Sequence, residues 1–401
     1  MTMMTLAQCL LKDYTEEELR HWSRFYGIRI GSSKPMTLAS RIAGKLLDEQ
    51  EMKQRLVILR EEEAQLFEQC MEESQTIDDT NRKTAERLIG TDYAYMTENG
   101  LIVPSDAAEV YRKLNTPAFR KERSLTSYLL DCLMFVEHVY LVIPLHELMN
   151  CFTGKYSILC REDVFSRCWN MIHPDDNPCM RTGDMIISRA AADVAAAILE
   201  ERGNHAFAYP EPEEITDWAV NGYPSMNSEC VHFLAWLKDN GLENSYAEEV
   251  MQNLTEMIAH GTDTEEVLEA LKTHMDITEP RFVPAEIRLK ALYSSIRSTL
   301  LGGAAPADEE AEMMRREGVR GNGEVLYAKT VLEAAKLIEK RPVLERLGYA
   351  VQVEKYAETV LVAFQRQGQK KTYVRILIFP NDPCPCGSGS PYRECHGRKR
   401  S

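Results

Sequence analysis

The C-terminal tail, residues 381–401, holds the pattern that most constrains this chain of 401 residues. Three cysteines and one histidine follow the spacing C-x-C-x8-C-H, as Cys384, Cys386, Cys395 and His396. Three thiolates and one imidazole complete the tetrahedral Cys3His set of a structural Zn²⁺ site and leave no ligand position for a substrate. We therefore predict one structural zinc ion in a segment whose function is recognition.

Disulfides or free thiols are the alternatives to this zinc site. A bond between Cys384 and Cys386 would close a very small, strained ring, and the other eight cysteines are scattered as in a reduced cytosolic protein. A segment this small has no core of its own. Metal binding should therefore supply its stability, which is about 10 kcal/mol or more in isolated finger peptides.

The tail resembles the SEC-C motif, the small zinc knuckle at the C-terminus of the bacterial translocase ATPase SecA and of many otherwise unrelated bacterial proteins. The resemblance rests on the four ligands and on the leading Asn-Asp-Pro at 381–383. It implies a zinc site and a docking role for the tail alone. Ser390 and Pro391 stand where the family usually carries lysines. A basic docking face is partly restored by Arg393, Arg398, Lys399 and Arg400.

Composition indicates a globular protein with an uneven charge. Hydrophobic residues make up 44% of the chain and charged residues 27%, and the net charge of −15 argues against a surface that coats nucleic acid or membrane everywhere. Residues 366–401 nevertheless carry +6. The chain has no apolar run of about 18 residues, and residues 1–11 lack the charged region of a signal peptide, so we expect a cytoplasmic protein without membrane insertion.

Residues 14–47 are predicted to form a helix, an extended linker and a second helix. Thr15 and Glu18 form a capping-box pattern, Gly27 stands where a helix ends, and Thr37 is the expected cap of the second helix. The pattern resembles the SAP and Rho N-terminal modules, which commonly contact nucleic acid. No acid occurs from 20 to 45, so the predicted phosphate-binding residues are Arg20, Arg24, Arg29, Lys34, Arg41 and Lys45. The alternative is a structural helix pair with solvated charges.

The middle of the chain predicts a winged-helix-like arrangement over 124–188. Three apolar helices, the second starting at Pro144, precede a hairpin with Thr182-Gly183 at its turn. Glu162 and Asp163 make the third helix a poor phosphate surface, which favours a role in protein packing. Long helices follow.

The predicted fold class is mainly α, multidomain, with a C-terminal β-hairpin and a zinc knuckle. The expected segments are 1–47, SAP-like; 48–120, helical; 121–210, winged-helix-like; 211–301, helical bundle; 302–323, linker; 324–380, helix and hairpin; and 381–401, zinc knuckle.

The predicted function is that of an adaptor that docks a protein or ribonucleoprotein partner through its knuckle, with nucleic-acid contact by the N-terminal module. The sequence shows no nucleophile elbow, HExxH motif, dinucleotide-binding glycine pattern or phosphate loop. We therefore predict no catalytic residues and no enzyme. The alternatives are a DNA-binding regulator that uses the SAP-like and winged-helix-like segments, or a hydrolase or nuclease of unrecognised type.

Overall fold

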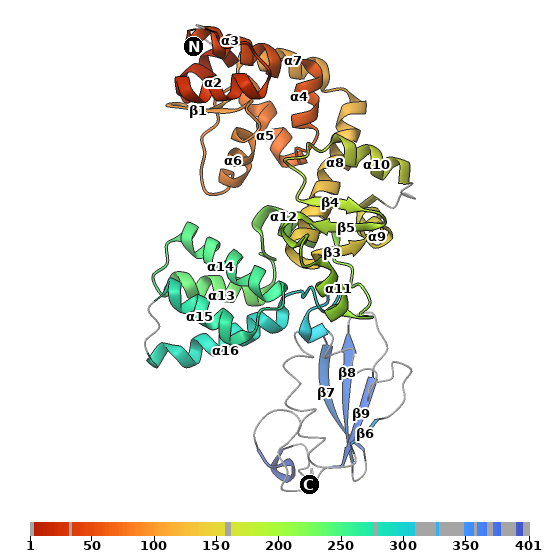
Figure 1. The fold of residues 1–401 in the computed structure, drawn as a ribbon. Coiled ribbons are helices and arrows are strands. Elements are labelled where there is room, and N and C mark those ends of the chain that lie inside the picture. The colour runs from red at the N-terminus through yellow and green to blue at the C-terminus, as the bar shows by residue number, and fades with distance from the viewer. Residues whose placement is uncertain are drawn as a thin grey trace. The chain divides into compact units, whose positions relative to one another are not determined.

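The computed structural model describes residues 4–31, 34–156, 162–275, 279–308, 326–328, 349–356, 359–366, 372–377 and 390–395. It confirms the predicted fold class, because helices dominate and the sheets are small. The chain divides into two compact units, residues 1–260 and residues 261–401, which we call the first and second units (Figure 1).

Three helices open the first unit. The Oγ1 atom of Thr15 accepts a hydrogen bond from the Glu18 amide at 3.3 Å, and the Glu18 carboxylate accepts one from the Thr15 amide at 2.7 Å, which confirms the capping box. Gly27, at φ +64°, follows the end of this helix. The next helix begins at Pro35 and not at the predicted Thr37, because proline's fixed φ suits a first helical position. The bounds are α1 Leu6–Asp13, α2 Glu16–Phe25 and α3 Pro35–Leu46; α1 was not predicted.

Four more helices and a short hairpin complete this N-terminal part. The charged segment over 48–73, for which the sequence predicts one helix or a pair, is a pair of helices. The hairpin is tied to the preceding segment by a bridge between Gln75 and Leu101. Gly100, at φ +114°, makes this approach possible, since a Cβ atom there would lie 2.3 Å from the Gln75 carbonyl oxygen. The bounds are α4 Glu49–Leu56, α5 Glu61–Glu72, α6 Arg82–Ile89, β1 Tyr95–Thr97, β2 Gly100–Ile102 and α7 Ser105–Leu114.

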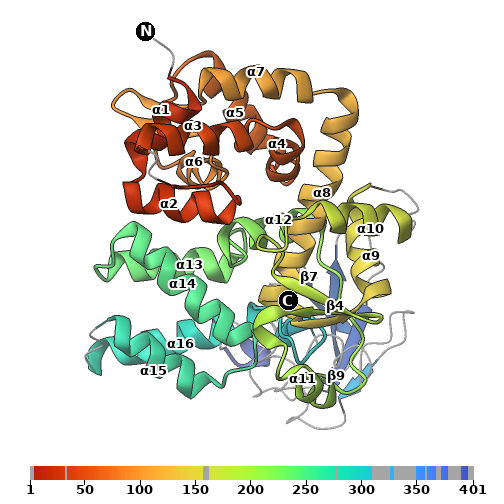
Figure 2. The ribbon, with the colours of Figure 1, turned by 45° about the horizontal axis from the view of Figure 1, so that its top comes forward.

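The middle of the first unit has the element order of the predicted winged helix, with one strand more. That strand, β3, ends at Pro144, which pairs with Met185, so Pro144 does not begin the helix as predicted. Figure 2 shows α8 running from the N-terminal helices to this part. The sheet is antiparallel in the order β3-β5-β4. The bounds are α8 Pro117–Phe135, the π-helix η1 Val136–Tyr140, β3 Val142–Pro144, α9 Leu145–Tyr156, α10 Glu162–Met171, β4 Cys179–Thr182 and β5 Met185–Ser188.

The last helices of the first unit pack against α8 and against one another. Trp218 on α12 is fully buried beside α8, and Phe233 is buried where α13 meets α14, whereas Trp236 is only half-buried and not a full core residue as predicted. The unpredicted α12 begins at Pro212, a proline in a favoured first position. The bounds are η2 Arg189–Ala191, α11 Ala195–Arg202, α12 Pro212–Asn221, α13 Ser228–Asp239 and α14 Asn244–Ala259.

A buried ion network joins α5 to α8. Arg60, next to the start of α5, donates from Nε to Asp131 of α8 at 2.8 Å and from Nη1 to Glu63 at 2.8 Å. Thr216 of α12 donates to the other oxygen of Asp131 at 3.2 Å. All three ionised side chains are buried, so each charge depends on the others for its solvation.

The described cysteines of the first unit are buried and form no disulfides. Burial raises the pKa of the Cys9 and Cys70 thiols to about 12, because the buried thiolate would lose its hydration. The set is Cys9, Cys70, Cys132, Cys151, Cys168, Cys179 and Cys230.

The described part of the second unit contains two α-helices and a four-stranded sheet. The predicted hairpin is present as β8 and β9, which pair antiparallel, and two further strands extend it in the order β6-β9-β8-β7. The predicted helix over 329–347 and most of the predicted linker lie outside the described residues. The bounds are α15 Thr264–His274, α16 Glu279–Ser295, β6 Leu326–Ala328, β7 Tyr349–Tyr356, β8 Thr359–Arg366 and β9 Thr372–Leu377.

Candidate functional site

The C-terminal motif is described over residues 390–395 only. A 3₁₀ turn, Tyr392–Glu394, leads directly into Cys395, which is half-buried and forms no disulfide. Three thiols with one imidazole are a donor set that suits Zn²⁺. The other three predicted ligands, Cys384, Cys386 and His396, lie outside the described residues.

The predicted docking residues of the tail are described at one position. Arg393 is exposed, and its Nε atom lies 3.4 Å from a carboxylate oxygen of Glu394. An exposed pair of this kind contributes little to stability. The predicted residues Arg398, Lys399 and Arg400 lie outside the described part of the tail.

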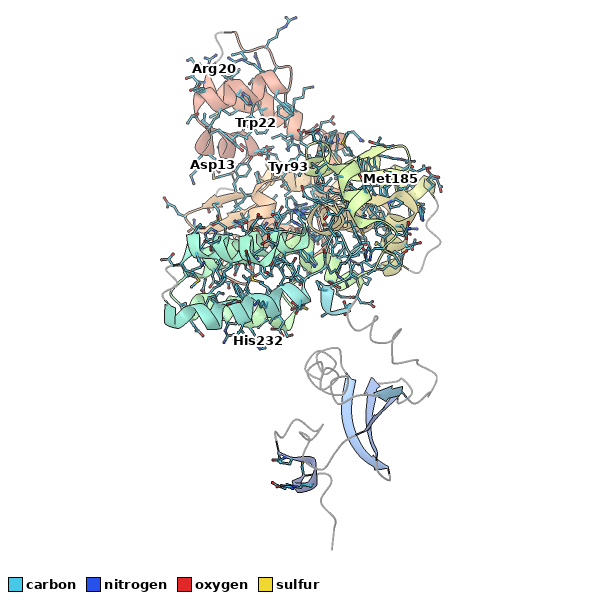
Figure 3. The ribbon with its side chains drawn as sticks, turned by 60° about the horizontal axis from the view of Figure 1, so that its bottom comes forward. Asp13, Arg20, Trp22, Tyr93, Met185 and His232 are labelled. Atoms are coloured by element: carbon cyan, nitrogen blue, oxygen red, sulfur yellow. The ribbon has the colours of Figure 1, made fainter. Side chains whose placement is uncertain are left out.

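The six predicted phosphate-binding residues lie on α2, on α3 and between them. We call them the basic face: Arg20, Arg24, Arg29, Lys34, Arg41 and Lys45. All are solvent-exposed except Arg20, which is half-buried. Figure 3 labels Arg20 and Trp22 on this part of the chain.

Two contacts modify the basic face. Arg20 pairs with Glu16 one turn earlier on α2, at 2.7 Å, so its charge is already balanced. Arg41 donates from Nη1 to the carbonyl oxygen of Arg29 at 2.8 Å, which brings two of the predicted residues together. The acid-free window from 20 to 45 excludes Glu16, and this is why the pairing was missed. The other residues remain candidates for phosphate contact.

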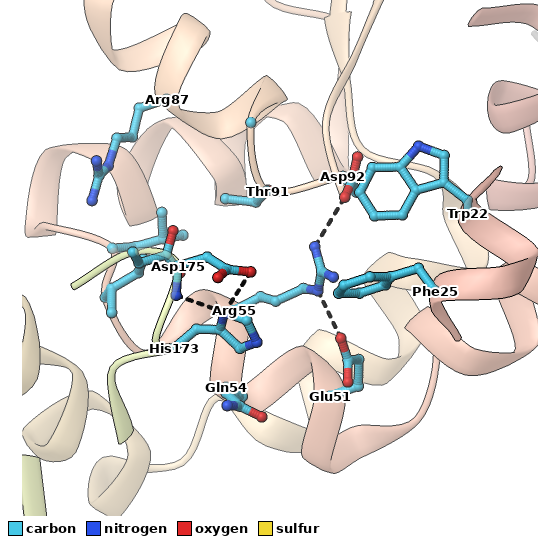
Figure 4. Close-up of a pocket in the computed structure, with 14 residues that line it drawn as sticks. Trp22, Phe25, Glu51, Gln54, Arg55, Arg87, Thr91, Asp92, His173 and Asp175 are labelled. Atoms are coloured by element: carbon cyan, nitrogen blue, oxygen red, sulfur yellow. Dashed lines mark hydrogen bonds and ion pairs between the residues drawn. The ribbon is translucent and has the colours of Figure 1, made fainter. Parts of the chain in front are cut away.

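A cleft of about 340 Å³ in the first unit was not predicted (Figure 4). Trp22 and Phe25 of α2 lie on one side of Arg55. His173 and Asp175 lie on the other side. The Phe25 side chain is 58% exposed, a large fraction for an aromatic residue. None of the basic-face residues lines this cleft, so α2 contributes aromatic side chains to the cleft and separate cations to solvent.

Arg55 in the centre of the cleft uses all three guanidinium nitrogens within the protein. It donates to Glu51 at 2.8 Å, to Asp92 at 2.9 Å and to the Tyr26 hydroxyl at 2.5 Å. Asp92 also accepts from the Tyr14 hydroxyl at 2.9 Å and has a positive φ of 65°. Asp tolerates this conformation better than most residues. Arg55 is therefore a fixed part of the wall, and two carboxylates balance its charge.

The opposite wall is the loop between α10 and β4, and its backbone is held by hydrogen bonds. The His173 carbonyl oxygen accepts from the amides of Asp176 and Asn177 at 3.0 and 3.1 Å, and the Asp175 amide donates to His173 Nδ1 at 3.2 Å. The carboxylates of Asp175 and Asp176 are exposed, and neither has a Lys or Arg partner among the described residues. The loop thus presents two exposed carboxylates without a Lys or Arg partner in the described ranges, and Asp175 lies 3.5 Å from His173 Nδ1.

The sequence places Cys160, Cys168, His173 and Cys179 within twenty residues, a grouping that suggested a metal site only weakly. Cys168 and Cys179 are buried, and Cys179 Sγ contacts the Leu133 carbonyl oxygen at 3.4 Å, whereas Cys160 lies outside the described residues. Within the described ranges, no group of three His, Cys, Asp or Glu side chains could hold a metal ion. Cys168 and Cys179 are core residues, as we expected of Cys168.

A second cavity, of about 480 Å³, lies beside the π-helix η1. His138 lines it and stacks on Trp218 with ring centroids 6.0 Å apart. Its Nδ1 atom is buried and has no hydrogen-bond partner within the described part of the chain. Burial lowers the pKa of His138 and of the neighbouring His260, because a buried imidazolium loses its hydration.

The C-terminal motif belongs to a defined class of small zinc-binding motifs: the family model described as SEC-C motif matches residues 381–398. Among curated proteins, the chain is similar to Protein translocase subunit SecA 1 of Nitrosospira multiformis, with 30% identity over 110 residues, which is 27% of this chain and 11% of the relative. It is also similar to Protein translocase subunit SecA of Methylobacillus flagellatus, with 35% identity over 72 residues, 15% of this chain and 7% of that relative.

The chain therefore spans only about a tenth or less of the length of these relatives. No solved structure matches the chain. None of the helices in the described ranges combines the length and apolar character that crossing a bilayer requires.

Proposed function

We propose that this chain is a cytoplasmic zinc-binding adaptor that uses its SEC-C motif to dock a protein or ribonucleoprotein partner. The observation that carries the proposal is the SEC-C match at 381–398, together with the four ligands Cys384, Cys386, Cys395 and His396. Zinc would have a structural role there, since the protein supplies all four ligands. The relatives are translocase subunits, which supports an association with proteins.

The N-terminal module adds nucleic-acid contact to this proposal. Arg24, Arg29, Lys34 and Lys45 are exposed cations, whereas Arg20 is paired with Glu16. Such side chains bind phosphates with an affinity that falls steeply as salt rises. The proposal includes no catalytic residues, because no catalytic motif occurs in the sequence.

A DNA-binding regulator is the second candidate, and the winged-helix order of α8, β3, α9, α10, β4 and β5 favours it. The charge of α10 speaks against duplex binding. Its first turn contains Glu162 and Asp163, and Arg181 of β4 pairs with Glu162 at 3.2 Å. A helix that enters a DNA groove needs cations for the phosphates on either side.

The zinc proposal is tested by the metal content of the purified full chain. We expect about one zinc per chain, and we expect the Cys384→Ser/Cys386→Ser variant to lose it. The matched control is Cys230→Ser, a buried cysteine of the first unit, which should keep the zinc. Full zinc content in the double variant would contradict the assigned ligands.

Nucleic-acid contact is tested by titrating labelled single- and double-stranded nucleic acid at two salt concentrations. We expect salt-dependent binding that weakens in the Arg24→Ala/Lys45→Ala variant, and the control is Lys238→Ala on α13. Zinc without such binding would leave a protein-docking module. Duplex-specific binding that is lost on changing α10 would favour the regulator.

A further inference from the structure

The cleft around Arg55 carries an excess of negative charge. Four carboxylates line it, from Glu51, Asp92, Asp175 and Asp176, against two guanidiniums, from Arg55 and Arg87. Arg55 is paired with the carboxylates of Glu51 and Asp92, and Arg87 lies 3.7 Å from the buried carboxylate of Glu63. The two carboxylates without a Lys or Arg partner therefore determine which charge the cleft attracts.

Aromatic rings stand opposite these carboxylates. Phe25 and Trp22 contact each other edge to face, with centroids 5.7 Å apart, and Trp22 stacks on Tyr26 at 5.9 Å. Ring faces attract cations and also cover the apolar stem of a long basic side chain. A guanidinium combines stacking on an aromatic ring with two hydrogen bonds to a carboxylate. The two walls of the cleft thus offer complementary halves of one recognition site.

We propose that this cleft docks an arginine- or lysine-rich segment of a partner protein. One basic side chain enters with its stem against Phe25 and Trp22 and its charged end at Asp175 and Asp176. The volume of about 340 Å³ lies at the lower end of ligand pockets, roughly 300–1,000 Å³, and suits one or two side chains. The site lies in the first unit and is separate in sequence from the SEC-C motif.

The rigidity of both walls supports this assignment. The Asp175 and Asp176 loop is held by the His173 carbonyl oxygen, and the aromatic wall is held where Arg55 links Tyr26 to Asp92. Walls fixed before binding reduce the ordering cost that binding would otherwise include. An anionic partner is disfavoured, because the exposed carboxylates would repel it and the charge of Arg55 is already balanced by Glu51 and Asp92.

The test measures binding of a fluorescein-labelled decapeptide of alternating arginine and glycine to the full chain by anisotropy. We expect salt-sensitive binding and no binding of the matching glutamate–glycine peptide. The Asp175→Asn/Asp176→Asn variant should bind about five- to tenfold more weakly, and Phe25→Ala about two- to fivefold more weakly.

Matched controls are available on the same unit. Glu200→Gln/Glu201→Gln removes two adjacent exposed carboxylates on α11, and Met226→Ala removes a side chain that is 86% exposed. Both should bind the peptide as the unaltered chain does. Equal losses in these controls, or unchanged binding in both cleft variants, would overturn the proposal.

Other occupants give different results. If the chain's own tail fills the cleft, the Arg398→Ala/Lys399→Ala/Arg400→Ala variant will bind the peptide severalfold more tightly, which would overturn assignment to a separate partner. If a second copy of the chain fills the cleft, sedimentation will show a dimer that Phe25→Ala abolishes. That result would also overturn assignment to a separate partner. The Cys384→Ser/Cys386→Ser variant should bind the peptide normally, so failure of the zinc proposal and failure of this one are distinguishable.

Discussion

At Gly100 a missing side chain allows two backbone segments to meet. The Gln75 carbonyl oxygen lies where a Cβ atom would stand, and the φ of +114° disfavours any other residue. Gly100→Ala should lower the free energy of unfolding by at least about 2 kcal/mol in urea titrations. The control is Gly44→Ala on α3, which has open space around it and should stabilise by about 0.5–1 kcal/mol. Equal effects at the two positions would contradict this explanation.

The buried His138 side chain should make the stability of the protein depend on pH. Its pKa, like that of His260, is lowered in the folded state, so below about pH 6.5 the unfolded chain takes up protons that the folded chain does not. Stability should therefore fall as the pH drops from about 7 to about 5. His138→Phe keeps a ring against Trp218 and removes the ionisable group, so unfolding free energies should depend less on pH.

The control for this prediction is His232→Phe on the exposed side of α13. It should change the pH dependence less than the substitution at 138. Other ionisable groups near η1 are Glu137 and Glu256, and burial raises the pKa of Glu137. A raised carboxyl pKa acts in the opposite sense, favouring the folded state as the pH falls through the carboxyl range. An unchanged slope in His138→Phe would show that these histidines do not control acid stability.

Between elements, the Arg60 network is the most sensitive connection. Arg60→Met leaves the buried carboxylates of Asp131 and Glu63 without their cation and should cost about 3–5 kcal/mol of unfolding free energy. Adding Asp131→Leu should recover part of that loss, since it removes one uncompensated charge. The control is Arg112→Met. Arg112 forms an exposed pair with Glu72, and losing this pair should cost less than about 1 kcal/mol of unfolding free energy. If the losses of unfolding free energy in Arg60→Met and Asp131→Leu simply add in the double variant, the two residues are not coupled.

Local signals predicted the elements that carry them. The Thr15 capping box, the hairpin around Thr182-Gly183 and the alternating strands near 359–377 all specify their own structure within a few residues. Elements such as β3 and β7 were missed, because strands this short or charged depend on tertiary pairing. The basic face was found from composition, but its pairing with Glu16 was not.

The cleft could not be predicted for a similar reason. Phe25 and Asp175 are 150 positions apart, and neither has a local pattern that marks it as a site. The one local signal is the pair of adjacent acids at 175 and 176, in a loop bounded by two prolines. Only the packing of the N-terminal helices beside this loop makes them opposing walls.

The whole molecule consists of two units, and the first has its own core. Residues 1–260 produced alone should therefore keep their helical circular dichroism and unfold cooperatively on heating. The arginine-peptide binding of the cleft should remain with this fragment. The full chain measured in parallel is the reference. A fragment without a cooperative transition would show that the first unit requires the rest of the chain.

The buried thiols of the first unit should react with alkylating reagents more slowly than exposed thiols do. A cysteine reacts with alkylating reagents as its thiolate, and desolvation keeps Cys9, Cys70 and the other buried cysteines protonated. If the C-terminal tail holds zinc as proposed, removing the metal should make its thiols react before these buried cysteines. A fluorophore placed there without any substitution would report on the docking segment itself.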